Sequence, residues 1–490
     1  MLPFMTAQED RPELADVGRL ARKLVDRAVR LARQEDQPLR RKLMEHLGPD
    51  AAYLPTVSDT CPLYDHVNLQ VGVDAWLSAE PGRTHEVVGI TGIGMIRYSD
   101  VTIGDLIQSG PDSMYGTAGA GAPITTNLPS GPDGQTRACV SNGIYLVTDG
   151  DDRLAIMFLP TGSGQQAEVQ LQIIGTGQAR VEQVMREVWR LAAEHSVFRG
   201  QVISFGPEMF GPGGSTTPLS FLRRPTVSRD QVVLPEALLD EIERQVIGIA
   251  RHSGRLLASG QHLKRGILLH GAPGTGKTHT VSYLLGKLTD VTVIVISGRA
   301  LGRIREACSV ARTLQPAAIV VEDVDLIAEE RTARPGEHPL LFQLLNEMEG
   351  LNSAADVTFL LTTNRADLLE PALAERPGRV DLAAELPLPD EDARRALFRL
   401  YQGGLVLDGV DVDAVIARTE GVTAPFLKEL LRKAALLAAD GDGPDGAESE
   451  VIRVRDEHIT TALDQLLTVR SQLTRVLLGG QAQVPAASAS

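Results

Sequence analysis

Gly271-Ala-Pro-Gly-Thr-Gly-Lys-Thr278 is the stretch that decides the fold of the second half of this 490-residue chain. It matches the pattern GxxxxGK[ST] in full, with the apolar residues 267–270 before it and a helical pattern after it. Glycines let backbone N–H groups curl around phosphate oxygens, and the positive end of the following helix faces those oxygens. The stretch therefore predicts a phosphate-binding loop between a strand and a helix.

The residues of this loop predict both ligands of the site. The ammonium group of Lys277 suits the β and γ phosphates of ATP, and the hydroxyl of Thr278 suits Mg²⁺. We therefore expect ATP and Mg²⁺ as cofactors. The residues expected to bind the nucleotide are Gly271, Ala272, Pro273, Gly274, Thr275, Gly276, Lys277, Thr278 and His279.

A second set of polar residues follows the apolar segment 317–321, which ends in Glu322 and Asp323. At the carboxyl end of a strand the chain is already turning, so one carboxylate can hold the metal while the other polarises a water molecule. From their positions, we expect Glu322 to bind Mg²⁺ and Asp323 to polarise the water molecule. The opposite division of roles stays open.

At these residues the sequence resembles the AAA family of ATPases, over about residues 221–478. Besides the two motifs above, Leu-Leu-Thr-Thr-Asn at residues 360–364 resembles the family's sensor-1 strand, which implies that Asn364 contacts the attacking water and the γ-phosphate. The segment 371–381 is similar to the second region of homology. There the resemblance implies that Arg376 and Arg379 reach into the nucleotide site of a neighbouring subunit, in a homo-oligomeric ring expected to have six members.

The resemblance and the alternation of apolar strands with helices predict an α/β fold for this half. We expect a P-loop AAA+ parallel sheet flanked by helices, a helical lid, and a separate α+β domain before them. The expected parts are an N-terminal helical segment (1–49), an α+β domain (50–215) for substrate or adaptor binding, the large ATPase subdomain (216–388), the lid (389–478) and a disordered tail (479–490). Residues 201–205 are expected to form the closing strand of the α+β domain.

The sequence departs from the common AAA pattern in two places. The acidic pair reads Glu322-Asp323 rather than Asp-Glu, and the segment 298–316 is short and contains no Tyr, Phe or Trp with which to grip an extended polypeptide. One branch of the family shares both departures, and the ATPase part of this chain resembles that branch. It includes the mitochondrial inner-membrane translocase of the folded Rieske iron–sulfur protein. The transmembrane helix of that branch is not found here, so membrane translocation is not implied.

Composition narrows the classes of function. A net charge of −15 and a pI of about 5.2 disfavour a nucleic-acid motor. The three cysteines form no CxxC pair, and no HExxH zinc-protease motif occurs. No signal peptide or membrane-length apolar run is found, so a cytoplasmic protein without a membrane partner is expected.

Two hypotheses follow. The first is a ring-forming ATPase that hydrolyses ATP to ADP and phosphate and remodels a protein bound at residues 1–215. The alternative is a slowly hydrolysing, nucleotide-dependent assembly scaffold or switch, which the Glu322-Asp323 order and the missing aromatic residues favour.

Overall fold

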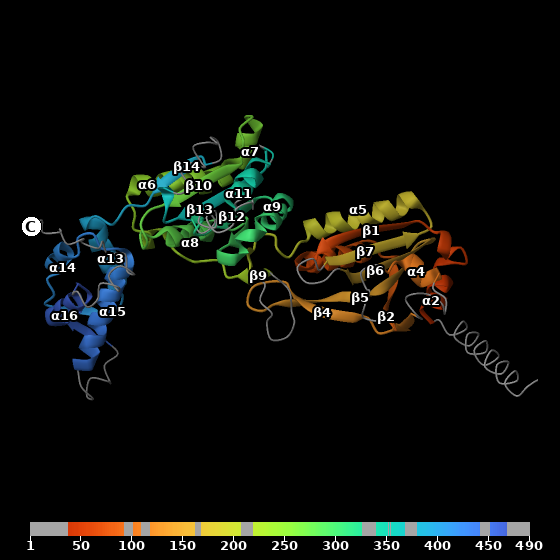
Figure 1. Ribbon diagram of the computed structural model, residues 1–490, viewed down its shortest axis with the longest axis horizontal. Helices are drawn as coiled ribbons and strands as arrows, with labels where there is room; N and C mark the ends of the chain where they lie inside the picture. Colours follow the sequence, from red (N-terminus) through yellow and green to blue (C-terminus); the bar gives the residue numbers. More distant parts are fainter. Residues whose placement is uncertain are drawn as a thin grey trace, which may run out of the picture. The chain divides into compact units, whose positions relative to one another are not determined.

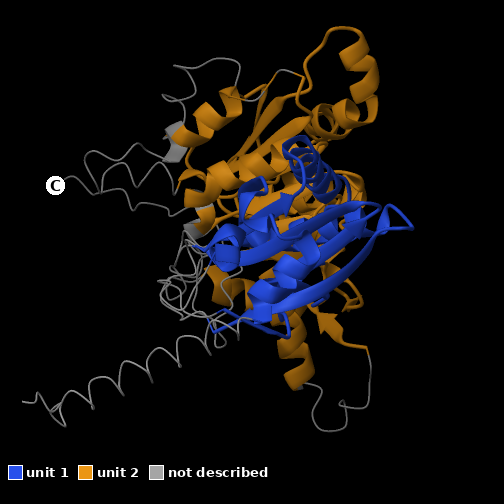
Figure 2. Ribbon diagram, turned by 90° about the vertical axis from the view of Figure 1, so that its right-hand side faces the viewer, with its two compact units in different colours: residues 1–130, 134–197 blue, residues 131–133, 198–490 orange. Residues whose placement is uncertain are grey.

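The computed structural model divides the chain into two compact units (Figure 2). Unit 1 comprises residues 1–130 and 134–197, and unit 2 comprises residues 131–133 and 198–490. The residues described are 38–92, 101–108, 118–161, 168–206, 219–325, 340–350, 352, 354–367, 380–441 and 451–467. Within these ranges, no helix is long and apolar enough to cross a membrane.

Unit 1 is built on an antiparallel sheet in the order β1-β7-β6-β5-β2-β3, with β4 also paired to β5. Six consecutive residues of the central strand β6, from Leu154 to Leu159, are buried. Both faces of the sheet must therefore be covered. The strands are β1 (Thr56–Pro62), β2 (Thr84–Thr91), β3 (Gly119–Gly121), β4 (Ile124–Pro129), β5 (Thr136–Asp149), β6 (Asp152–Thr161) and β7 (Glu168–Gly175).

Helices cover both faces of this sheet. The long helices α3 (His66–Ser78) and α5 (Gln178–Glu194) pack on one face, and α5 is seen running along the sheet in Figure 1. The helices α2 (Pro38–Leu47) and α4 (Ile103–Gln108) pack on the other. This arrangement confirms the predicted α+β class of the N-terminal domain, and it makes α2 part of that domain's core.

The sheet of unit 2 has the order β14-β10-β13-β12-β11-β8-β9, and every pair except β8–β9 is parallel. Its strands are β8 (Val202–Phe205), β9 (Leu219–Leu222), β10 (Arg265–His270), β11 (Thr292–Ile296), β12 (Ala317–Val321), β13 (Val357–Thr363) and β14 (Leu382–Glu385). Its helices are α6 (Glu236–Glu243), α7 (Ile249–Ala258), α8 (Lys277–Lys287), α9 (Ile304–Thr313) and α11 (Leu340–Glu349). The predicted parallel sheet flanked by helices is confirmed (Figure 1).

The expectation for residues 201–205 is wrong. These residues form β8, which pairs in parallel with β11 of the unit 2 sheet rather than closing the sheet of unit 1. A short apolar run predicts a buried strand but does not specify its partner. The division between the units accordingly falls after Val197, ahead of the expected boundary at residue 215.

The C-terminal part of unit 2 is a small helical bundle, which confirms the predicted lid. The helices α13 (Glu391–Gln402), α14 (Val412–Arg418), α15 (Ala424–Gly441) and α16 (Asp456–Leu467) share one apolar core. A parallel pair of three-residue strands, β15 (Val406–Asp408) and β16 (Arg453–Arg455), accompanies them. The carboxylate of Asp390 accepts a hydrogen bond from Ala393 N–H and so caps the first helix of this bundle.

Gly72 sets the distance between α3 and α5. A Cβ atom at Gly72 would lie 2.5 Å from the carbonyl oxygen of Val188 and 2.8 Å from Cβ of Ala192, both on α5. We therefore expect Gly72→Ala to destabilise unit 1 by about 1–3 kcal/mol, because the helices must separate. The two tryptophans of the chain, Trp76 and Trp189, lie on these helices, so urea unfolding followed by tryptophan fluorescence measures this unit.

The control for this prediction is Gly104→Ala in α4. A Cβ atom there would lie 3.5 Å from the hydroxyl oxygen of Thr102, which is ordinary contact distance. The unfolding midpoint should then stay near that of the native protein. A Gly72→Ala protein as stable as the native one would contradict the close packing of α3 on α5.

Candidate nucleotide-binding site

The phosphate-binding loop joins β10 to α8, as the sequence predicts. Two of its glycines occupy the left-handed region of backbone conformation, with φ of +80° at Gly274 and +99° at Gly276. Gly276 is also the N-cap of α8, so the first N–H groups of that helix face the loop. Backbone N–H groups at a helix N-terminus form an anion-binding site.

Lys277 lies inside the loop and is only 7% exposed. Its Nζ donates hydrogen bonds to the carbonyl oxygens of Gly271 (2.8 Å) and Ala272 (2.9 Å). Burial lowers the pKa of this ammonium group, and the carboxylates of Asp323 and Asp325 act in the opposite direction. The ammonium group of Lys277 is therefore held inside the loop, where the negative charges of two acidic residues that follow β12 act on it.

Thr278 and Glu322 are brought together from different elements. Thr278 is the second residue of α8, Glu322 directly follows β12, and the Thr278 hydroxyl lies near enough to the Glu322 carboxylate to lower its pKa. Burial is the main reason that the pKa of Glu322 is raised, the charge of Asp323 raises it further, and the Thr278 hydroxyl opposes both. A hydroxyl and a carboxylate in contact are the two protein ligands that Mg²⁺ takes beside nucleotide phosphates.

Asp323 and Asn364 also meet, at the ends of the neighbouring strands β12 and β13. The Asn364 amide Nδ2 donates to Oδ1 of Asp323 over 3.3 Å. Asp323 has a positive φ of 52°, and its N–H donates to the hydroxyl oxygen of Thr362 at 3.1 Å. The positive φ accompanies an exposed Asp323 carboxylate that bonds to Asn364, so these two predicted site residues form one group.

Asp325 is a site residue that the sequence prediction missed. It is 8% exposed and accepts hydrogen bonds from the hydroxyl of Thr363 (2.8 Å) and the N–H of Asn364 (3.2 Å). It thereby fixes the backbone from which the Asn364 side chain reaches Asp323. The sequence does show a third acidic residue two positions after Asp323. An acidic residue in such a segment is usually exposed to solvent, so its sequence position alone does not indicate a role in the site.

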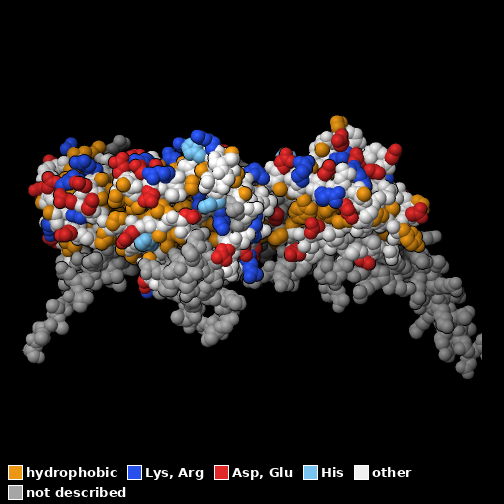
Figure 3. Space-filling model, turned by 90° about the horizontal axis from the view of Figure 1, so that it is seen from above, with side chains coloured by type: hydrophobic (Ala, Val, Ile, Leu, Met, Phe, Trp, Pro, Cys, Tyr) orange, Lys and Arg blue, Asp and Glu red, His pale blue; other side chains and the backbone are white. Residues whose placement is uncertain are grey.

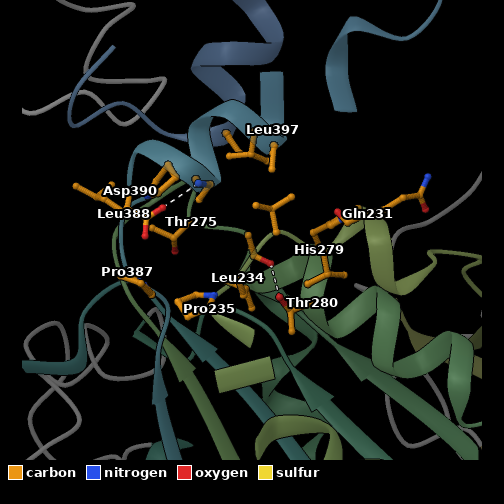
Figure 4. A pocket seen from close by; sticks show the side chains of 18 of the residues that line it. Gln231, Leu234, Pro235, Thr275, His279, Thr280, Pro387, Leu388, Asp390 and Leu397 are labelled. Atoms are coloured by element: carbon orange, nitrogen blue, oxygen red, sulfur yellow. Dashed lines mark hydrogen bonds between the residues drawn. The ribbon is translucent and has the colours of Figure 1, made fainter. Parts of the chain in front are cut away.

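A cavity of about 350 Å³ adjoins the phosphate-binding loop (Figure 4). Four parts of unit 2 form its walls: the segment before α6, the loop with the start of α8, residues between 387 and 401 at the start of the lid, and the start of α15. Its apolar walls and its position beside the loop fit the base and ribose of a nucleotide. Lining residues are Gln231, Val232, Val233, Leu234, Pro235, Gly274, Thr275, Gly276, His279, Thr280, Pro387, Leu388, Pro389, Asp390, Asp392, Ala393, Ala396, Leu397, Tyr401 and Ala424.

The structure places the remaining predicted residues with respect to this cavity. His279 lines it, with Nε2 3.0 Å from the carbonyl oxygen of Gln231. The turn at residues 420–425 lies against the loop, because a Cβ atom at Gly274 would meet Thr423 Oγ1 at 3.0 Å. Arg376 and Arg379 lie outside the described residues.

The comparisons with known proteins agree with this geometry. The model of the family "ATPase family associated with various cellular activities (AAA)" matches residues 267–388, from β10 to the chain segment after β14. Residues 267–388 form an AAA ATPase domain. The α/β fold of unit 2 is accordingly the AAA+ fold that the sequence predicts.

Similar proteins include ATP-dependent proteases and a proteasome subunit. The chain is 31% identical over 279 residues (54% of this chain and 55% of the relative) to the ATP-dependent zinc metalloprotease FtsH 3 of Sphaerobacter thermophilus. It is 34% identical over 189 residues (36% and 48%) to the 26S proteasome regulatory subunit 6B homolog of Encephalitozoon cuniculi. The chain spans about half the length of these relatives.

Asp325 provides the test of this site. We expect Asp325→Asn to lower the rate of ATP hydrolysis about 10- to 100-fold, because a neutral amide accepts hydrogen bonds more weakly than a buried carboxylate. The affinity for ATP should fall less than turnover, since the hydrogen bonds of Asp325 go to Thr363 and Asn364 rather than to the loop. Steady-state kinetics and equilibrium ATP binding measure the two effects. Asp464→Asn, at a carboxylate that is 56% exposed, is the control, and equal turnover in both variants would contradict the assignment.

Proposed function

We propose that this protein hydrolyses ATP to ADP and phosphate and uses the cycle to remodel a bound protein. The observation that carries the proposal is the pair of contacts at the carboxyl edge of the unit 2 sheet. There the Thr278 hydroxyl lies beside Glu322, and the Asn364 amide donates a hydrogen bond to Asp323. A metal-holding pair and a water-holding pair then lie side by side, next to a phosphate-binding loop.

Each residue has a distinct task in this proposal. The N–H groups of the loop and the ammonium group of Lys277 bind the phosphates, exchanging the carbonyls of Gly271 and Ala272 for stronger, charged acceptors. Thr278 and Glu322 hold Mg²⁺, which neutralises charge on the phosphates when bound. Asp323 accepts the proton of the attacking water, and Asn364 orients that water toward the γ-phosphate.

Arg376 and Arg379 complete the site from a neighbouring subunit in this proposal, which rests on their resemblance to the family's paired arginines. Arginine fingers stabilise transition-state charge and contribute about 10³–10⁵-fold to turnover. The rate per subunit should therefore rise with protein concentration and then saturate. Arg379→Ala should abolish turnover at all concentrations while ATP binding persists, and a loss of ATP binding instead would contradict the finger role.

The names of the relatives support a role in protein handling, since they denote ATP-dependent proteases and a proteasome regulatory subunit. We place the substrate or adaptor on unit 1. The likeness to the Rieske-translocase branch is part of this proposal, supported by the Glu322-Asp323 order and by the segment 298–316 without aromatic residues. The ring of six subunits and the cytoplasmic location remain predictions from the sequence.

The alternative function is a slow nucleotide switch, and Asp323 favours it. Asp is one methylene shorter than the Glu found at this place in the common family pattern, and its carboxylate is already engaged by Asn364. A water molecule polarised at greater distance would react slowly. Asp323→Asn separates the two functions: a fall in turnover supports hydrolysis through Asp323, whereas unchanged turnover removes any catalytic role from it.

A nucleic-acid motor is the least supported function. On the face drawn in Figure 3, the Lys and Arg side chains are interspersed with Asp and Glu, and the net charge of the chain is −15. Retention on phosphate backbones needs a concentrated basic surface.

The raised pKa of Glu322 predicts how nucleotide binding depends on pH. Glu322 must be ionised to hold Mg²⁺, so the affinity for Mg·ADP should fall with decreasing pH at a higher pH than for an ordinary glutamate. Asp323→Asn removes one of the charges that raise this pKa, and it should move the fall to lower pH. Titration calorimetry of Mg·ADP binding at a series of pH values measures the shift. Identical profiles for both proteins would contradict the role of Glu322.

A further inference from the structure

Arg224 binds four backbone carbonyl groups with one guanidinium. Its Nη1 donates to the oxygens of Leu285 (2.8 Å) and Leu288 (2.6 Å), and its Nη2 donates to those of Gly200 (2.8 Å) and Val291 (3.1 Å). The planar guanidinium presents its donors in a fixed geometry that no other side chain reproduces. Arg224 therefore holds three chain segments of unit 2 in a set arrangement.

Two of these carbonyls belong to the end of the helix that follows the phosphate-binding loop. Leu285 lies in the last turn of α8, and Leu288 is its C-cap residue. The final carbonyls of a helix lack donors within the helix and carry partial negative charge. A half-buried cation that bonds to both therefore fixes the position of the C-terminal end of α8.

The other two carbonyls belong to the entry of the sheet. Gly200 precedes β8 and Val291 precedes β11. The two strands are joined there by a hydrogen bond from Gly200 N–H to the Thr292 hydroxyl (3.1 Å) and by one from Val293 N–H to the Gln201 carbonyl (2.8 Å). The end of α8 is thus tied to the point at which the chain enters the sheet of unit 2.

Gly286 gives an independent sign of the same close junction. A Cβ atom at Gly286 on α8 would lie 2.7 Å from the carbonyl oxygen of Pro225, the residue after Arg224. Only glycine lets the backbone at Pro225 approach the helix so closely. The guanidinium and the adjacent backbone therefore hold this end of α8 from two directions.

We propose that Arg224 is a positioning residue of the nucleotide site, acting through α8 on the contact between Thr278 and Glu322. The eleven residues of α8 form a rod about 16 Å long. Thr278 lies at one end of this rod and the Arg224 junction lies at the other, so a tilt permitted at the junction moves Thr278 away from Glu322. The inference rests on the proposed function, because the contact matters as a Mg²⁺ site.

The test compares ADP affinity with and without Mg²⁺ in the full-length protein. Binding without the metal depends on the loop backbone and Lys277, whereas the gain on adding Mg²⁺ depends on Thr278 and Glu322. We expect Arg224→Ala to reduce that gain about 10- to 100-fold, as misplacement by about 1 Å does at reacting sites. Affinity without Mg²⁺ should change by less than about twofold, as for an independent site.

Two further variants keep the test decisive if Arg224→Ala fails to fold. Arg224→Lys keeps the charge but loses the fork of donors, so it should lose part of the Mg²⁺-dependent gain. Gly286→Ala pushes the Pro225 carbonyl away and should also reduce the gain, without touching the arginine. Arg186→Ala, at an arginine on α5 that is 69% exposed, is the matched control and should behave as the native protein.

The outcomes separate the two proposals. If the Mg²⁺-dependent gain in ADP affinity is unchanged in Arg224→Ala and Gly286→Ala, the positioning role is overturned. The proposed function then still stands, provided that the native protein hydrolyses ATP. An equal loss of ADP affinity with and without Mg²⁺, accompanied by a lower melting temperature, would show that Arg224 supports only the fold. That result would also overturn the positioning role. Native protein that binds no ADP under either condition would overturn the proposed function itself.

Discussion

The parallel pairing of β10, β13 and β12 is the constraint on which the site depends. Adjacent parallel strands end at the same edge of a sheet, so the segments that follow them must lie close together. The phosphate-binding loop, Asn364 and the Glu322-Asp323 pair occupy those three ends. None of these groups needs a long or flexible connection to reach the others, because the strand order places the three ends side by side and brings Asn364 within hydrogen-bonding distance of Asp323.

The same constraint explains how much of the site the sequence could predict. The loop is a local motif, and Glu322, Asp323 and Asn364 each follow a recognisable apolar strand, so strand order alone places them together. Asp325 follows the same strand as Asp323, but its role depends on burial beneath Asn364, which the sequence does not encode locally. The walls of the nucleotide cavity come from four segments without a shared motif, and their assembly is a property of the tertiary fold.

The strand β8 shows a different limit of sequence-based prediction. Apolarity accounts for the burial of Val202, Ile203 and Phe205, but a short apolar run does not specify which sheet it joins. Its partner is decided by the Gly200–Thr292 hydrogen bond and the carbonyls gathered by Arg224. These are long-range contacts of single polar groups. The chain that leaves unit 1 thereby becomes a structural part of the ATPase sheet rather than a free linker.

The reversed order of the acidic pair is explained by the different reach required of each carboxylate. From the half-buried position after β12, the longer side chain of Glu322 extends toward Thr278 on α8, whose hydroxyl lowers its pKa. The next residue has a positive φ, which costs an L-residue roughly 1–2 kcal/mol but which Asp tolerates better than most. That turn directs even a short carboxylate to Asn364. The backbone conformation at Asp323 thus compensates for the methylene that its side chain lacks.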